Sequence, residues 1–69
     1  MFDRKRLQAQ MVLRSYTGKR LSEELGITES TLYRKMNNDG DFSRAEINKM
    51  IDILQIEDPK AIFFATELA

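Results

Sequence analysis

Apolar residues recur along this chain at the spacing of amphipathic helices, and β-branched residues never alternate with polar ones over the length of a strand. The clearest repeat follows the i, i+3, i+4, i+7 pattern of a helix with one buried face, and it consists of Ile47, Met50, Ile51 and Leu54. Together with their start and stop signals, these patterns predict an all-α fold of five helices, at about residues 3–15, 18–25, 29–37, 44–54 and 59–68.

The ends of the predicted helices carry local signals. Gly26 follows the last apolar residue of the second helix, where a residue that tolerates left-handed dihedral angles commonly ends a helix. Thr28 stands two residues later and can cap the third helix. The other signals are the N-cap candidates Asp3 and Thr17, the turn at residues 37–40, the capping box of Ser43 and Glu46, and Asp58 before Pro59.

Two short helical patterns meet at Gly26, and their arrangement suggests a function. Leu21 and Leu25 lie four residues apart, on one face of the first helix. Leu32 and Met36 have the same spacing on the second. In a helix, a tight glycine turn and a second helix, the second helix can enter a DNA major groove. The rest of the chain can then serve to present that helix.

The composition of the chain excludes several classes of protein. A chain of 69 residues allows one domain, 1–69, with a small core. It contains no Cys and no His, so we expect no disulfide, no metal site and no cofactor. No apolar run approaches the roughly 20 residues of a membrane span, and no signal-peptide core follows the N-terminus. We therefore expect a cytoplasmic protein without a membrane partner, associated with the nucleoid in a bacterial host.

The charges of the chain are unevenly distributed, although its net charge is zero. Residues 1–36 hold eight Lys or Arg against four Asp or Glu, and residues 37–69 hold three against seven. Such asymmetry fits a polyanion partner for the basic half, but a neutral protein can also segregate its charges without one. The basic cluster at residues 4–6 has the same two interpretations: a solvated helix end, or a contact with phosphates at the flank of a DNA site.

The last predicted helix is apolar on two sides. One side carries Ile62 and Phe63, and the other carries Ala61, Phe64, Ala65 and Leu68. A second apolar surface on so small a domain indicates contact with another subunit, so we predict a homodimer interface at Ile62 and Phe63. The alternative is that a small core covers both sides of this helix.

The segment that runs from Thr17 to Leu32, TGKRLSEELGITESTL, resembles the helix-turn-helix of phage repressor and Cro-type proteins, in particular of small prophage-encoded members. The order and lengths of the five predicted helices also fit, so the resemblance covers roughly residues 4–68. It implies a compact repressor-like domain whose third helix lies in the major groove.

Three positions depart from the pattern of that family. Gly18 stands where the family often has a glutamine that touches a phosphate, so only the backbone N–H is available there. Ser22 replaces a usual alanine, and its hydroxyl needs a hydrogen-bond partner. Met11 and Met36 stand where some members have a buried ion pair, and an apolar pair can replace one with little loss of stability.

The resemblance also assigns roles to residues of the third helix and its surroundings. The base-reading positions are Glu29, Ser30, Tyr33 and Arg34. The candidates for phosphate contact are Thr17, Lys19, Thr31, Lys35, Asn37 and Arg44. Arg34 can bond guanine O6 and N7 bidentately. Glu29 can accept a hydrogen bond from cytosine N4, or it can serve only as an acid that favours the helix dipole.

We therefore expect a sequence-specific regulator of transcription that binds a palindromic double-stranded DNA operator as a homodimer. The alternative is a protein-interaction module on the same fold, antirepressor or antitoxin-like, that reads no operator. Neutral net charge, Gly18 and Glu29 favour this alternative slightly. We expect neither an enzyme nor a small-molecule substrate, because no carboxylate pair lies in a context that forms a pocket.

Overall fold

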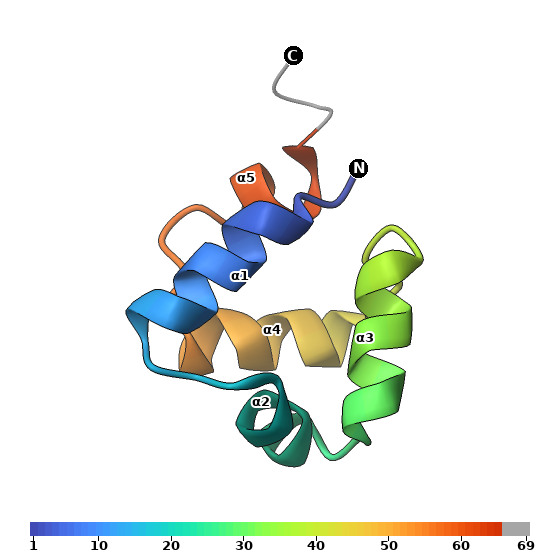
Figure 1. Ribbon diagram of the computed structural model, residues 1–69. Coiled ribbons are helices and arrows are strands. Elements are labelled where there is room, and N and C mark those ends of the chain that lie inside the picture. Colours follow the sequence, from blue (N-terminus) through green and yellow to red (C-terminus); the bar gives the residue numbers. More distant parts are fainter. Residues whose placement is uncertain (66–69) are drawn as a thin grey trace.

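The computed structural model of the protein describes residues 1–65, and these form five helices and no strand. This arrangement confirms the predicted all-α fold (Figure 1). The last helix ends earlier than predicted, and Leu68 lies outside the described residues. The helices are α1 (Arg4–Leu13), α2 (Gly18–Leu25), α3 (Glu29–Asn37), α4 (Arg44–Ile53) and α5 (Pro59–Phe63).

Side-chain caps explain why four of these helices begin where they do. Asp3, Thr17 and Thr28 each accept a hydrogen bond from the backbone N–H three residues later. Ser43 and Glu46 form the reciprocal capping box predicted for α4. Asp58 and Pro59 occupy the predicted N-cap and first positions of α5, but the Asp58 side chain makes no capping hydrogen bond.

The turn between α2 and α3 depends on the backbone conformation of Gly26. Its φ of 74° lies in the left-handed region, and a Cβ added there would meet no atom within 4 Å. Glycine is therefore required by the dihedral angles and not by lack of space. The N–H of Ile27 donates to the carbonyl of Ser22 at 3.0 Å, which closes the turn.

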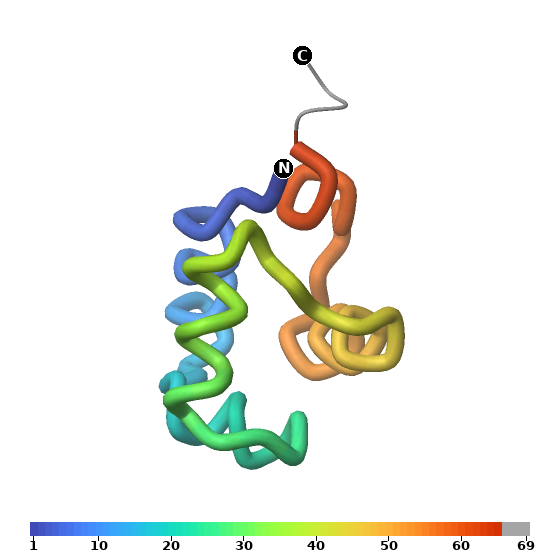
Figure 2. The backbone as a smooth tube through the Cα atoms, turned by 90° about the vertical axis from the view of Figure 1, so that its right-hand side faces the viewer, coloured from blue at the N-terminus to red at the C-terminus, as the bar shows by residue number. Residues whose placement is uncertain are grey.

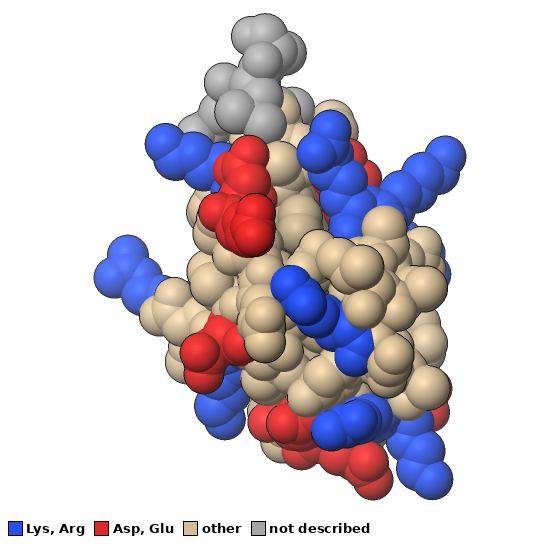
Figure 3. Space-filling model, turned by 90° about the vertical axis from the view of Figure 1, so that its left-hand side faces the viewer, with Lys and Arg blue, Asp and Glu red and all other residues tan. Residues whose placement is uncertain are grey.

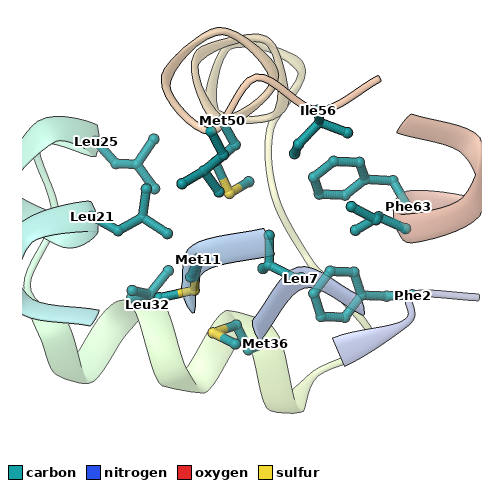
Figure 4. Packing of buried hydrophobic residues seen from close by; sticks show 12 residues of the cluster. Phe2, Leu7, Met11, Leu21, Leu25, Leu32, Met36, Met50, Ile56 and Phe63 are labelled. Carbon is teal, nitrogen blue, oxygen red and sulfur yellow. The ribbon is translucent and has the colours of Figure 1, made fainter. Parts of the chain in front are cut away.

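All five helices enclose one apolar core (Figure 4). Met11 and Met36 are both buried in it, as expected for an apolar pair in place of an ion pair. Burial of each large side chain contributes about 2 kcal/mol to folding. The five that are completely enclosed are Leu7, Leu21, Leu32, Met50 and Leu54.

An N-terminal segment, residues 1–3, ties distant parts of the chain together. The N–H of Phe2 donates to a carboxylate oxygen of Asp39 at 3.0 Å, and the N–H of Asp3 donates to the carbonyl of Ile62 at 2.7 Å. The ring of Phe2 packs against those of Phe42 and Phe63, with centroids 5.8 and 5.9 Å away. The α3–α4 connection and α5 are therefore held at the same end of the molecule.

This packing corrects the predicted dimer interface. Ile62 and Phe63 are 5% and 6% exposed, and both belong to the core of the single chain. The helical spacing placed them on a separate face, but α1 and the N-terminal segment cover that face. Their assignment to a dimer contact is therefore wrong. Pairing of two chains stays a prediction, and its surface has to be sought elsewhere.

Candidate functional site

Helix α3 forms one edge of the molecule and has a buried and an exposed side (Figures 1 and 2). Leu32 and Met36 are 0% and 2% exposed and anchor it to the core. Glu29, Ser30 and Arg34 are exposed. None of these three side chains forms a hydrogen bond or ion pair within residues 1–65, so their polar atoms are free to meet a partner.

Tyr33 lies beside this exposed row, but it is half-buried and has a contact of its own. A Cβ at Gly18 would stand 2.3 Å from the Tyr33 hydroxyl oxygen, closer than real atoms approach. The Tyr33 ring therefore occupies the space above the first residue of α2. This contact explains the glycine at position 18, because any side chain there would displace the ring.

Thr28 and Thr31 join at the start of α3. The Thr28 hydroxyl oxygen accepts the N–H of Thr31 at 3.1 Å, and the Thr28 hydroxyl donates to the Thr31 hydroxyl oxygen at 2.9 Å. Because Thr31 accepts this bond, its own proton remains free to donate to an anion. The cap that starts the helix thus also orients one of the predicted phosphate contacts.

Lys35 forms an ion pair that the sequence did not predict. Its ammonium group lies 2.9 and 3.2 Å from the two carboxylate oxygens of Glu46, and these side chains are only 19% and 13% exposed. The pair links the C-terminal part of α3 to the first turn of α4. Phosphate contact by Lys35 stays a prediction, and its charge is already balanced by a largely buried carboxylate.

Opposing effects act on the Glu46 carboxyl group. Partial burial raises its pKa, but the hydrogen bond from the Ser43 N–H, together with the hydrogen bond and charge of Lys35, outweighs burial. The pKa of Glu46 is therefore below its ordinary value. The charged form is the one that the fold stabilises.

The side chain of Asn37, at the end of α3, also has a hydrogen-bond partner. Its amide oxygen accepts a hydrogen bond from the guanidinium group of Arg4, which brings the basic start of α1 beside the C-terminal end of α3. Lys5 is exposed nearby in sequence, whereas Arg6 turns to Asp3 with a separation of 3.3 Å. Arg4 thus joins the candidate site, and the basic cluster at residues 4–6 was its signal in the sequence.

At the start of α2, one of two basic side chains has no ion-pair partner within the described residues. The Arg20 guanidinium stacks on the Tyr16 ring at 4.5 Å and lies 3.5 Å from Glu24. A hydrogen bond with Glu24 raises the pKa of Tyr16. Lys19 is exposed and has no ion pair within the described residues. Of the two cations in this turn, Lys19 is therefore the one free to meet an anion.

Ser22, Thr17 and Arg44 also belong to this region. The hydroxyl of Ser22, a residue only 2% exposed, donates to the carbonyl of Lys19 at 2.7 Å, which satisfies its need for a partner. Thr17 serves as the cap of α2 and remains exposed. Arg44 is exposed at the start of α4, where it borders an apolar depression together with Phe42.

The face turned away from α3 carries charges of both signs. Basic and acidic side chains are mixed there around uncharged surface, and neither sign forms a continuous patch (Figure 3). Among residues 1–65 no group of three or more His, Cys, Asp or Glu could hold a metal ion. In the same part of the chain, no helix has the length and apolar character needed to cross a membrane.

Comparisons of the chain with protein-family models, with curated proteins and with solved structures each found no match.

Proposed function

We propose that this protein is a sequence-specific double-stranded DNA-binding regulator of transcription, related in kind to phage repressor and Cro-type proteins. The observation that carries the proposal is the exposed, uncommitted row of Glu29, Ser30 and Arg34 on α3. The buried side of α3 and the Gly26 turn hold this row at the edge of the molecule. A helix presented in this way has the dimensions that the major groove admits.

The exposed row contains suitable chemistry for reading bases. Arg34 can donate two hydrogen bonds to a guanine edge, which discriminates against other bases by about 1–3 kcal/mol. Ser30 can donate or accept. Glu29 either accepts from cytosine N4 or only stabilises the helix N-terminus, as the sequence already allowed. Tyr33 borders the row from its position over Gly18.

Positions around α3 would contact phosphates and set the register of the protein on DNA. Lys19 lies at one end of the site, and Arg4 lies at the other, where Asn37 holds it. Thr31 offers its hydroxyl proton, Thr17 lies at the α2 terminus, and Arg44 lies at the α4 terminus. This set would give binding that weakens as the salt concentration rises.

One short helix reads only a few base pairs, and the net charge of zero limits attraction to DNA. Useful affinity therefore requires two chains on a palindromic operator, with half-sites about one helical turn apart. A regulator of this kind works in the cytoplasm on the bacterial nucleoid.

A selection of binding sites from random DNA tests the proposal most directly. We expect an enriched palindrome whose half-sites are separated by about one helical turn. Enrichment of no sequence by a folded protein would contradict operator reading.

The same sites test the role of Arg34. Arg34→Ala should relax the preference at one base pair per half-site by about 1–3 kcal/mol. The matched control is Lys19→Ala, which should weaken all sequences alike and reduce the dependence of binding on salt. Equal losses on selected and random DNA for Arg34→Ala would remove Arg34 from the base-reading set.

A second candidate is the protein-interaction module, antirepressor or antitoxin-like. It is favoured by Val12 and Leu13 of α1, which are 77% and 66% exposed. Leu13 borders a groove of about 520 Å³ between α1 and α5. Failure of the wild-type protein to retard DNA from its own upstream region at low salt would favour this candidate.

A further inference from the structure

The groove between α1 and α5 has a volume of about 520 Å³, and we call it the α1–α5 groove. Helix α1 forms one wall, and the connection between α4 and α5 forms part of the other. Its floor is apolar and consists of the buried residues Ile56, Ala61 and Ile62. Most of the other lining residues are exposed, so the groove is open to solvent. An open groove suits a polypeptide better than a small molecule, which a binding site usually encloses.

Arg14 is a cation held in place at the α1 wall of the groove. Its Nε–H donates to the carbonyl of Leu54 at 3.2 Å, and the residue is half-buried. It forms no ion pair within residues 1–65, and the N–H groups at the end of its guanidinium have no partner there. A guanidinium held in this way presents a planar fork that matches a carboxylate. Arg14 can therefore bind a carboxylate from outside the chain.

Leu13 provides an apolar anchor at the rim, beside this charged one. It is 66% exposed, and Ala9, four residues earlier, lines the same wall. Val12 is 77% exposed but does not line the groove. A partner seated in the groove would cover Leu13 and the apolar floor together, which removes apolar surface from water.

The two walls of the groove differ in charge. Between residues 4 and 14 the chain has four Lys or Arg and no acidic residue. The opposite wall carries Glu57 and Asp58, which are exposed and form no ion pair within residues 1–65. An occupant that complements both walls has carboxylates on one flank, basic groups on the other and apolar side chains between them. A second copy of α1 would not complement the α1 wall, because both are basic.

The α1–α5 groove lies away from the candidate DNA-reading helix. In Figure 1 the C-terminal end of α1 and the connection between α4 and α5 are at the left, whereas α3 is at the right. Figure 3 views the molecule from that left-hand side and shows acidic and basic side chains with uncharged surface between them. A chain with α3 on DNA would keep this side exposed, so a partner could occupy the groove with or without DNA.

We infer that the α1–α5 groove binds a helical segment of a different protein. The acidic flank of this segment faces Arg14, its basic flank faces Glu57 and Asp58, and its apolar stripe covers Leu13 and the groove floor. A helix supplies an apolar stripe and two flanks in one element. Because α1 has 10 residues and spans about 15 Å, about three turns of the partner helix fill the groove. The inference goes beyond the proposed function and does not depend on it.

A selection with the full chain from a display library of helical peptides, each about 14 residues long, tests the chemistry of the partner. The enriched peptides should have an apolar stripe with Asp or Glu on one flank and Lys or Arg on the other. Enrichment of no peptide by the folded chain would overturn the inference. Enriched peptides that lack an acidic flank would also overturn it.

Fluorescence anisotropy with one enriched peptide tests the charged contact. Arg14→Glu should weaken binding at least tenfold, because it places like charges together. A second peptide, with its acidic flank changed to Lys, should bind Arg14→Glu more tightly than it binds the wild type. The matched control is Lys49→Glu, at an exposed residue of α4 outside the groove, and it should leave binding unchanged. Equal losses for the two variants, or no rescue by the second peptide, would overturn the inference.

Matched apolar substitutions test the location of the contact. Leu13→Ala should weaken binding of the first peptide at least tenfold, whereas Val12→Ala should leave it unchanged. The circular dichroism spectrum and thermal unfolding of each variant show that it is folded. A loss with Val12→Ala and not with Leu13→Ala would place the contact outside the groove and overturn the inference. Sedimentation equilibrium without peptide covers the other occupant, because pairs of the wild type that Leu13→Ala dissociates would show a second copy in the groove and overturn it too.

The outcomes for the inference and for the proposed function are separable. If the chain binds the selected peptides through Arg14 and Leu13 but retards no DNA at low salt, the inference stands and the proposed function fails. If the chain retards DNA and enriches no peptide, the proposed function stands and the inference fails.

Discussion

The pair α2–α3 and the opposite end of the molecule are held together in different ways. In α2–α3 the caps of Thr17 and Thr28 and the turn at Gly26 join residues no more than five positions apart. At the other end, the contact of Phe2 with Asp39 spans 37 positions, and that of Asp3 with Ile62 spans almost the whole chain. The conformation of the candidate site is therefore fixed by contacts between residues close in sequence. Its attachment to the rest of the molecule depends on contacts between residues far apart in sequence.

This difference predicts where substitutions cause the greatest loss of stability. Phe63→Ala removes one ring of the Phe2, Phe42 and Phe63 cluster and should lower the free energy of unfolding by about 3–5 kcal/mol. Urea unfolding followed by circular dichroism measures the loss. The matched control is Phe64→Ala at a concentration where the chain is monomeric, and it should cost less than about 1 kcal/mol. Similar losses for the two variants would show that Phe63 is not in the core.

Two glycines, one from each region, provide a sharper comparison. Gly26 and Gly40 have φ values of 74° and 69°, but a Cβ at Gly40 would stand 2.4 Å from the Phe2 ring. Gly26→Ala should therefore cost roughly 1 kcal/mol, from the left-handed conformation alone. Gly40→Ala should cost roughly 2–4 kcal/mol, because it also displaces Phe2. Equal costs in urea unfolding would refute the role of the N-terminal segment.

The Lys35–Glu46 pair connects the two regions and has a dependence on pH. Because the pKa of Glu46 is lower in the folded chain than in the unfolded one, its contribution is complete above the ordinary carboxyl range. It is lost as pH falls through the folded pKa. Glu46→Gln should cost about 1 kcal/mol at neutral pH, and its difference from wild type should shrink in acid. A difference that stays constant from neutral pH into acid would contradict this account.

The smallest expected effects concern two residues in the left-handed conformation. Gln55 and Asp39 have φ values of 50° and 54°. Gln55→Gly should stabilise the fold by about 0.5 kcal/mol. The relief of backbone strain in the folded chain should exceed the larger conformational entropy that glycine loses on folding. Asp39→Gly should destabilise it by about 0.5 kcal/mol, because the bond from the Phe2 N–H is lost. Thermal unfolding of the two variants should show shifts of opposite sign.

The same difference decides what could be predicted from the sequence. The helices, most of their caps and the Gly26 turn were predicted correctly, because a cap and its N–H partner stand three residues apart. The inner residues of α3 were also predicted, since Leu32 and Met36 follow the helical period. The roles of the exposed residues in binding remain predictions.

Contacts between distant positions could not be predicted in this way. Nothing near Phe2 indicates that its ring packs on Phe63, and nothing near Lys35 indicates that Glu46 lies across the α3–α4 connection. The error at Ile62 and Phe63 has the same origin. Helical spacing identified two apolar sides of α5, but only the three-dimensional packing shows that the side of Ile62 and Phe63 is covered.

The N-terminal segment has a consequence for synthesis of the protein. Its partners in α5 are among the last described residues to leave the ribosome, whereas residues 18–37, which form α2 and α3, are made much earlier. A nascent chain can therefore form the α2–α3 turn while Phe2 and Phe42 still lack their third ring. A product truncated before Phe63 would expose these two aromatic side chains, and exposed apolar surface of this kind is what chaperones and proteases recognise.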